Sequence, residues 1–356
     1  TSSRGLGDVY KRQPFQESDN TEELYVHHSF KADQGQSPLR VDKFLMNFLP
    51  DTSRTRIQKA AEAEAIRING KPVKSNHKVK PGDLVEMVLG QPPRDKEILP
   101  EDMELDIIHR DEHVIVINKK AGLVCHPGHG NYTGTLVNGL AFLAENLPIG
   151  KQGEERPGLV HRLDKNTSGV MVAAASELGM THLAKQFYDR STSREYIAIV
   201  WGDVKEEEGT ITGNIGRSLR DRLQMAVFED ESEGKHAVTH YKVVQRFGYV
   251  TVVSCKLETG RTHQIRVHMK HLGHPLFNDE RYGGDKILKG TSFSKYKQFI
   301  FNCFKACPRH SLHAQSLGFV HPSSGENMVF QKELPEDMQE VIRKFEIYTS
   351  ASLKNR

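Results

Sequence analysis

The sequence predicts an α+β protein: a mixed, mostly antiparallel central sheet with flanking helices, preceded by a small α/β module. From residue 103 onward, segments that read as strands dominate and few helical segments lie between them. Residues 39–90 combine one helical segment with short strands joined by turns. The stretch "GQPPRDKEILPED" separates these parts and carries three prolines, which is typical of a linker of limited flexibility.

Four segments follow from these patterns. Residues 1–38 are expected to be a lead-in that starts with a disordered tail or an artefact, because "TSSRGLGDVYKRQ" has charges but no apolar segment behind it. The small module spans 39–90, the linker 91–102 and the large domain 103–350. At 356 residues the chain is long enough for two hydrophobic cores.

Composition restricts the class of protein. The four cysteines are scattered and too few for a disulfide framework, which favours a reducing, cytoplasmic location. No apolar run approaches the roughly 20 residues of a membrane helix, so we expect no membrane partner. The net charge is only +3, so a nucleic-acid signal has to come from local clustering.

Such a cluster lies in the small module. Residues 39–90 hold ten Lys and Arg against six Asp and Glu, a net of +4 that exceeds the charge of the whole chain. Ser53 is a good N-cap for the helix that follows, and Arg54, Arg56 and Lys59 fall within two turns of it. Taken alone, this run is more often a solvated helix face than a binding surface.

The large domain opens with a predicted hairpin over 105–120, turning at Asp111–Glu112. Helical spacing follows over 133–147 and again over 176–190, where Ser176 is the expected cap. Strands are predicted over 194–202, 209–216, 237–247 and 249–260, and a further helix begins after Thr262. Residues 217–241, basic and then acidic, are expected to form a mobile loop that either grips RNA or is a plain surface loop.

The stretch "HRLDKNTSG" (161–169) is the strongest candidate site. Apolar residues run up to Val160 and resume at Val170, so the nonapeptide is predicted to be a polar loop between buried strands. Its cations would hold Asp164 ionised against the cost of burial. A second cationic cluster, "LETGRTHQIRVHMKHLGHPLFND" (257–279), places Arg261 at a strand-to-helix corner and Arg266 a turn and a half later.

Metal binding is a weaker interpretation of two clusters. His263, His268, His271 and His274 lack the spacing of known ligand motifs. Cys303, Cys307, His310 and His313 match no common zinc motif either. We therefore expect no metal.

Several motifs together carry a family resemblance. "HRLDKNTSG", "REYIAIVWG", "LETGRTHQIRVHM" and "SLHAQSLGFVHP" occur in this order and resemble the motifs of the RluA-type family of ribosomal pseudouridine synthases, most like the RluD branch. Residues 39–90 are similar to the alpha-L RNA-binding domain, although that family usually has Gly where this chain has Glu64–Ala65. The resemblance implies an RNA cleft across the sheet and no cofactor.

The resemblance also implies roles for individual residues. Asp164 matches the catalytic aspartate, Tyr196 the tyrosine that stacks on the target uracil, and Arg261 the basic residue paired with the aspartate. Arg162 matches the arginine associated with flipping the target nucleotide, and Leu312 an apolar residue packed in the site. We assign Arg266 and the helix residues Arg54, Arg56 and Lys59 to RNA binding.

The predicted activity is isomerisation of specific uridines to pseudouridine in large-subunit (23S) ribosomal RNA by a monomeric enzyme. The RNA partner would be the large-subunit RNA or its assembly precursor. Two alternatives stay open: a transfer-RNA-directed synthase of the same family, and a non-catalytic RNA-binding factor of ribosome assembly. Whether the carboxylate acts as a nucleophile or stabilises charge on the ribose is also open.

Overall fold

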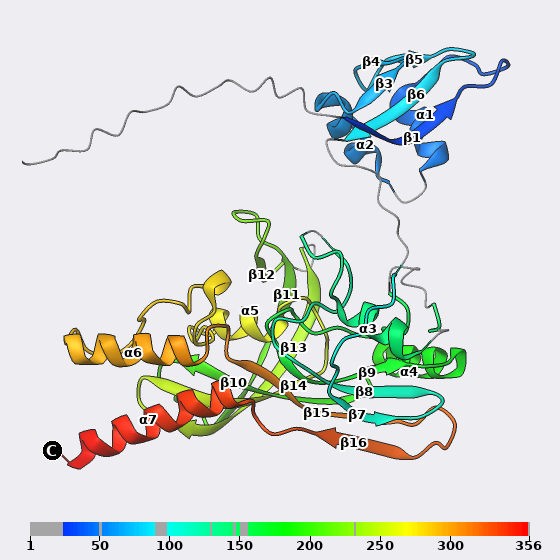
Figure 1. Ribbon diagram of the computed structural model, residues 1–356. Helices are drawn as coiled ribbons and strands as arrows, with labels where there is room; N and C mark the ends of the chain where they lie inside the picture. The colour runs from blue at the N-terminus through cyan, green and yellow to red at the C-terminus, as the bar shows by residue number, and fades with distance from the viewer. Residues whose placement is uncertain are drawn as a thin grey trace, which may run out of the picture. The chain divides into compact units, whose positions relative to one another are not determined.

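The computed structural model describes residues 24–49, 52–89, 98–128, 130–144, 147–149, 156–230 and 233–354, with side chains up to residue 350 (Figure 1). The chain divides into two units, residues 1–95 and 96–356. Each unit has its own hydrophobic core, so each is described separately.

The N-terminal unit packs two helices against a small antiparallel sheet. The helices are α1 (Val41–Phe48) and α2 (Arg54–Glu62). The sheet has the order β1-β6-β3-β4, with β1 (Tyr25–Lys31), β3 (Ile66–Ile68), β4 (Lys71–Pro72) and β6 (Leu84–Leu89); β2 (Leu39–Arg40) pairs separately with β5 (Lys78–Val79). Strand β1 lies within the segment predicted as a lead-in, so this unit begins before residue 39.

Helix α2 begins and ends through local backbone chemistry. The Ser53 hydroxyl accepts a hydrogen bond from the Arg56 N–H at 3.4 Å, which confirms the predicted cap. After the helix, Glu64 takes a left-handed conformation with φ of 56°. The helix therefore ends with the geometry that a Gly would give, and Glu64 bears the strain of a side chain in that conformation.

The larger unit is built on a ten-stranded mixed sheet. The order is β12-β11-β13-β14-β10-β15-β9-β8-β7, and β16 pairs with β15. Among the described strands only β15 and β9 pair in parallel, so the prediction of a mixed, mostly antiparallel sheet is confirmed. The strands are β7 (Ile107–Arg110), β8 (Val114–Lys119), β9 (Ser168–Ala174), β10 (Ser193–Trp201), β11 (Glu208–Arg217), β12 (Met225–Phe228), β13 (Lys235–Arg246), β14 (Val250–Leu257), β15 (Leu312–Val320) and β16 (Asn327–Gln331).

Helices cover both faces of this sheet because its central strands are apolar on both sides. Along β10, Tyr196 and Ala198 point to the core beneath α3 (Leu136–Leu143) and α5 (Gln264–His271). The alternate residues Ile197 and Trp201 point to α6 (Ser294–Ala306) and α7 (Glu336–Lys354), which lie side by side (Figure 1). Helix α4 (Glu177–Asp189) packs over β8 and β9, and Ser176 caps it as predicted.

Three local predictions were wrong. Residues 156–160 form no strand; Leu159 contacts the sheet only through an isolated bridge to Ala173. Much of 217–241 is ordered, because β12 pairs with β11 to make a hairpin and β13 begins at Lys235. Helix α5 begins after His263, which has φ of 58° and provides no side-chain cap, so Thr262 is not the capping residue.

No helix among the described residues is both long and apolar enough to cross a bilayer.

Candidate active site

The loop that carries Asp164 enters the middle of the sheet, just before β9. There Ser168 and Gly169 pair with His313 and Ala314 of the parallel strand β15. Gly169 has φ of 122°, and a Cβ at this position would lie 2.2 Å from the Ala314 carbonyl oxygen. Only glycine allows this close approach, so Gly169 fixes where the loop meets the sheet.

A buried lysine holds the front of the loop. Lys119 is 1% exposed, and its ammonium group donates to the carbonyl oxygens of Lys120, Leu123 and Lys165 at 3.0, 2.8 and 3.1 Å. Burial lowers the pKa of Lys119 to about 8, so the side chain is mostly protonated at neutral pH. The residue after Asp164 is thus tied to the end of β8.

Side chains before and within β15 hold the back of the loop. The Arg309 guanidinium donates to the Asn166 carbonyl at 2.9 Å, and His310 Nε2 lies 2.9 Å from the Thr167 hydroxyl. Asp337, at the start of α7, binds Arg309 through both carboxylate oxygens. The loop is therefore fixed from both ends, which orients Asp164.

Asp164 forms an ion pair with Arg266. Arg266 Nη1 lies 2.9 Å from Asp164 Oδ2, while Nε and Nη2 of the same guanidinium donate to Asp279 at 2.7 and 2.9 Å. The expected partner, Arg261, instead donates from Nε to the His236 carbonyl at 3.0 Å. The pairing prediction was wrong because Arg266 lies on α5 one turn inside the site, whereas Arg261 precedes the helix.

This environment keeps the Asp164 carboxyl ionised. Burial by itself would raise its pKa, but His263 when protonated, and the charge and hydrogen bond of Arg266, lower it. Burial lowers the pKa of His263 to about 4, so this imidazole is neutral at pH 7. Arg266 is consequently the cation that stabilises the Asp164 carboxylate.

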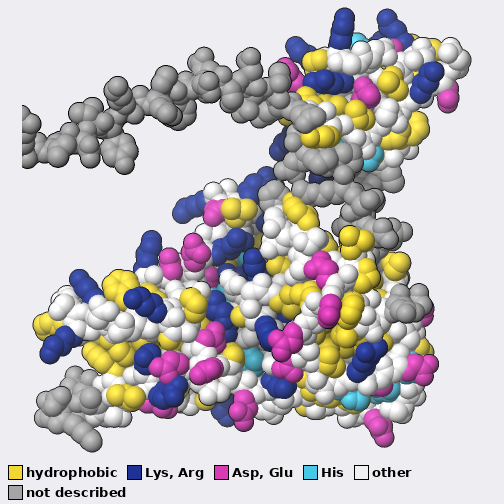
Figure 2. All heavy atoms as spheres, viewed as in Figure 1, with side chains coloured by type: hydrophobic (Ala, Val, Ile, Leu, Met, Phe, Trp, Pro, Cys, Tyr) yellow, Lys and Arg dark blue, Asp and Glu magenta, His cyan; other side chains and the backbone are white. Residues whose placement is uncertain are grey.

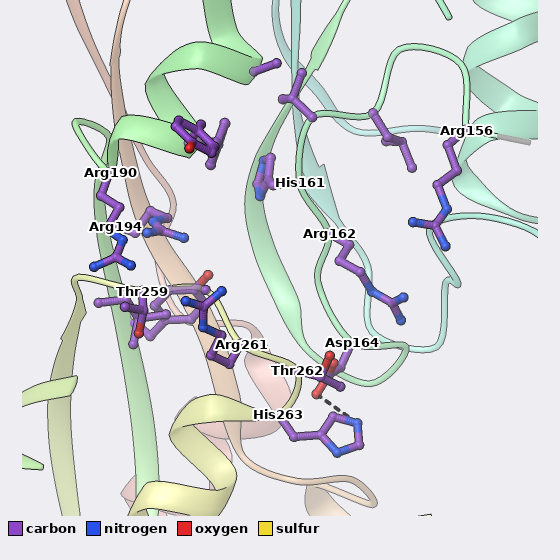
Figure 3. A pocket seen from close by; sticks show the side chains of 18 of the residues that line it. Arg156, His161, Arg162, Asp164, Arg190, Arg194, Thr259, Arg261, Thr262 and His263 are labelled. Carbon is purple, nitrogen blue, oxygen red and sulfur yellow. Dashed lines mark ion pairs between the residues drawn. The ribbon is translucent and has the colours of Figure 1, made fainter. Parts of the chain in front are cut away.

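The carboxylate opens into a cavity of about 930 Å³ (Figure 3). Arginines line this cavity on two sides of Asp164: Arg156 and Arg162 on one, and Arg190, Arg194 and Arg261 on the other. A second hollow of about 630 Å³ also includes Asp164 and Arg162. Figure 2 shows Lys and Arg side chains gathered along the middle of the larger unit on the face in view. Asp164 thus lies on a continuous, basic groove.

An aromatic side chain forms part of the cavity wall. Tyr196 is 8% exposed and packs in the same apolar cluster as Leu312 and Leu163. Burial and the charge of Asp164 raise the pKa of Tyr196, although Arg194 opposes this shift, so its hydroxyl is neutral. It can donate one hydrogen bond and offer an apolar ring.

The structure brings most of the predicted residues together. Asp164, Tyr196, Arg162 and Arg261 line one cavity, and Leu312 and Arg266 contact its surroundings. The other three predicted residues, Arg54, Arg56 and Lys59, are exposed on α2 of the N-terminal unit. Arg54 is also held there by Asp42, at 3.0 Å.

Sequence reasoning missed two residues around Asp164, Asp279 and Tyr282, and considered a third, His263, only as a metal ligand. His263 Nε2 lies 3.7 Å from Asp164 Oδ2, Tyr282 contacts His263, and Asp279 binds Arg266. Asp279 is 1% exposed and Tyr282 2% exposed. Asp279 and Tyr282 lie in "NDERYGG". The sequence feature that could have indicated them is an acidic and an aromatic residue soon after the cationic helix.

The suspected ligand cluster of Cys303, Cys307, His310 and His313 has structural partners. Cys303 and Cys307 are buried in the apolar cluster around Trp201. His313 is hydrogen-bonded to the Ser168 hydroxyl at 2.9 Å, and His310 is hydrogen-bonded to the Thr167 hydroxyl at 2.9 Å. Within the described ranges no group of three or more His, Cys, Asp or Glu side chains could hold a metal ion.

An ionised carboxylate at the centre of a mixed sheet, facing an arginine-lined groove, is the arrangement expected of an enzyme that acts on a polyanion. The RNA pseudouridylate synthase family model matches residues 113–271, and the S4 domain model matches residues 39–85. The second match lies in the module predicted to be an alpha-L RNA-binding domain.

Two relatives extend these matches over most of the chain. An uncharacterized RNA pseudouridine synthase of Chlorobaculum parvum is 44% identical over 89% of this chain and 97% of its own length. The ribosomal large subunit pseudouridine synthase D of Nitrosomonas europaea is 37% identical over 92% of this chain and 89% of its own length. The chain belongs to the RNA pseudouridine synthase family, and is therefore an isomerase whose substrate is RNA.

A solved structure shows the same fold. Human RNA pseudouridylate synthase domain containing 4 aligns with 68% of this chain and 93% of its own, at 24% identity and a TM-score of 0.51.

Proposed function

We propose that this protein converts specific uridines of large-subunit ribosomal RNA to pseudouridine, with Asp164 as the catalytic carboxylate. The observation that carries the proposal is the geometry of Asp164. Arg266 holds Oδ2, while Oδ1 has no hydrogen-bond partner among the described residues, and the carboxylate lines both hollows of the groove. One carboxylate oxygen is thereby left for the substrate.

The reaction breaks the bond from ribose to the ring nitrogen, rotates the uracil and joins the ribose to ring carbon 5. An ionised carboxylate can attack the ribose or stabilise its developing positive charge, and can later assist removal of the proton from carbon 5. The fixed loop supplies this group without reorganisation, because Lys119 and Arg309 hold its neighbours.

Residues of the cavity wall supply the remaining requirements. The Tyr196 ring, packed beside Leu312, gives a flat surface on which the detached uracil can remain. Flipping a nucleotide out of its stack costs a few kcal/mol, which phosphate contacts have to offset. Arg162, Arg190, Arg194 and Arg261 line the cavity and provide these contacts.

The large-subunit target is supported by the chain's similarity to a ribosomal large subunit pseudouridine synthase D and by its S4 domain. In this proposal Arg54, Arg56 and Lys59 bind the RNA backbone outside the active site. The enzyme acts as a monomer in the cytoplasm.

The test is pseudouridine mapping of ribosomal RNA from cells that lack the gene, complemented with wild type or with Asp164→Asn. We expect particular large-subunit sites to lose pseudouridine and only wild type to restore them. Loss confined to transfer RNA would replace the proposed substrate by the alternative one. Full restoration by Asp164→Asn would refute the catalytic role of Asp164.

A further inference from the structure

The β11–β12 hairpin contacts the residues behind the active site. Arg281 Nη1 donates to the Leu223 carbonyl at 3.1 Å, and Lys270 Nζ lies 3.4 Å from Gln224 Oε1. The Met225 N–H donates to the Tyr282 hydroxyl oxygen at 3.1 Å. Three consecutive residues of the hairpin are thus docked on α5 and on η1 (Glu280–Tyr282).

The outer part of this hairpin is suited to hold RNA. Arg217, Arg220 and Arg222 are exposed, and Leu219 is 80% exposed. A hollow of about 570 Å³ beneath the hairpin shares Arg261 and Thr262 with the cavity of Asp164. The two hollows therefore adjoin, and together they offer a path for an RNA strand from the Asp164 cavity to the hairpin.

Tyr282 links the docked hairpin to Asp164. Its hydroxyl oxygen lies 2.7 Å from His263 Nδ1, and His263 Nε2 lies 3.7 Å from Asp164 Oδ2. The Tyr282 ring also lies under the Arg266 guanidinium, 4.9 Å from its carbon to the ring centroid. Tyr282 thus contacts both side chains that face Oδ2.

The proton positions on Tyr282 and His263 follow from the groups that these two side chains contact. A neutral imidazole carries one N–H, and the carboxylate facing Nε2 favours placing it there. Nδ1 is then an acceptor, so the Tyr282 O–H has to donate to it. The Tyr282 oxygen can at the same time accept from the Met225 N–H. The result is a hydrogen-bonded chain from the hairpin backbone to His263, whose Nε2–H faces Asp164 Oδ2 at 3.7 Å.

We infer that Tyr282 is a positioning residue that couples RNA held by the β11–β12 hairpin to the orientation of the Asp164 carboxylate. The inference rests on the proposed role of Asp164. The Met225 N–H of the docked hairpin fixes the Tyr282 hydroxyl, which fixes the His263 tautomer and turns Nε2–H toward Oδ2. Oδ1 is thereby left for the substrate, and RNA bound under the hairpin stabilises the docked position on which this arrangement depends.

The first experiment reads the tautomer without substrate. Nitrogen NMR of histidine-labelled full-length protein distinguishes an imidazole protonated at Nε2 from one protonated at Nδ1. We expect His263 to be protonated at Nε2 in wild type and to lose this preference in Tyr282→Phe, which keeps the ring. Protonation at Nδ1 in wild type overturns the inference, whatever the activity of the protein.

The second experiment measures catalysis, with large-subunit RNA from cells lacking the gene as the probe. We expect Tyr282→Phe to lower kcat about tenfold with little change in KM, as loss of one oriented hydrogen bond implies. The matched control is Tyr296→Phe, whose hydroxyl donates to the Lys289 carbonyl at 2.8 Å in the other core. Equal kcat values for Tyr282→Phe and the control overturn the inference.

A pH profile separates positioning from a structural defect. The titratable and charged groups around Asp164 include Lys119, Cys125, Tyr196, His263, Arg266, Tyr282 and His310, together with Arg162, Lys165, Asp279 and Arg309. In Tyr282→Phe the His263 Nε2–H no longer stabilises the Asp164 carboxylate, so the pKa of Asp164 rises. The acid limb of the kcat–pH profile then moves to higher pH. An unmoved acid limb contradicts the inference.

Coupling to the hairpin gives the last test. Arg281→Gln loosens the hairpin through the Leu223 contact and should lower kcat in wild type. In the Tyr282→Phe background the same change should have little further effect on kcat, because the link is already broken. Fully additive effects overturn the coupling. If wild type is inactive on this RNA but Tyr282→Phe changes the His263 tautomer as expected, the proposed function is refuted. The positioning of Asp164 by Tyr282 is then still supported.

Discussion

The ion triad Asp164–Arg266–Asp279 gives the sharpest quantitative prediction. The three side chains are 18%, 7% and 1% exposed, and Arg266 makes three charged hydrogen bonds to the two carboxylates. Arg266→Met removes the cation and leaves two buried carboxylates uncompensated. Breaking a buried pair in this way costs about 3–5 kcal/mol. For a unit of this size, the midpoint of thermal unfolding should fall by roughly 6–20 °C.

The pH dependence has a definite sign. In wild type the pKa of Asp164 is lowered, so its contribution to stability is present above the unfolded value of 3.8 and is lost as pH falls through the folded pKa. In Arg266→Met only His263 still opposes the effect of burial, and its imidazole is neutral above its pKa of about 4, so the folded pKa of Asp164 rises above that of wild type. The stability deficit of the variant should therefore shrink as pH falls from 7 toward 4.

Thermal unfolding at pH 7 and pH 5, with pseudouridine formation measured in parallel, checks this prediction. The double variant Arg266→Met/Asp279→Leu is the matched control, because it replaces the fully buried pair by apolar groups. It should recover stability but remain inactive. A loss below about 1 kcal/mol in the single variant, or a deficit that grows toward pH 5, would refute the reasoning.

Three further predictions concern the loop, the sheet and the N-terminal unit. Lys119→Met leaves three carbonyls without their donor and should cost about 3 kcal/mol together with most activity; unfolding and turnover within error of wild type would contradict this. Gly169→Ala places a Cβ 2.2 Å from the Ala314 carbonyl and should prevent stable folding. The control Gly248→Ala is also at positive φ but has nothing within 4 Å, so it should cost only about 1 kcal/mol. Equal losses of unfolding free energy, measured with denaturant, would be evidence against close packing at Gly169. Glu64→Gly relieves a left-handed conformation and should stabilise the N-terminal unit by up to about 1 kcal/mol, measured by hydrogen exchange in that unit; a destabilised unit would show that Glu64 is not strained.

Local patterns in the sequence determined most elements and their order. The Asp111–Glu112 turn, the Ser53 and Ser176 caps and the strand over residues 194–202 depend on neighbours within a few positions, and the structure has each of them. The loop with Asp164 was recognised for the same reason, since its charged residues and glycine are contiguous. Ordered motifs then indicated the family.

Tertiary structure decided which side chain serves Asp164. Arg261 and Arg266 are five residues apart in one cationic run, and nothing local distinguishes them. Only the left-handed turn at His263 and the start of α5 direct Arg266 inward, where Asp279 receives it. Contacts across about a hundred residues, such as Arg266 with Asp164, depend on how strands pair, and a linear pattern does not encode that pairing.

The same reason explains the hairpin. Residues 217–241 have the composition of a polar loop, yet β12 pairs with β11 and Met225 meets Tyr282, 57 residues further along the chain. By itself the sequence determined the fold class, the family and the loop proposed to be catalytic, because these depend on local chemistry and contiguous motifs. Only the folded chain decided the partner of Asp164 and the link from hairpin to active site, because both arise from segments brought together by the sheet.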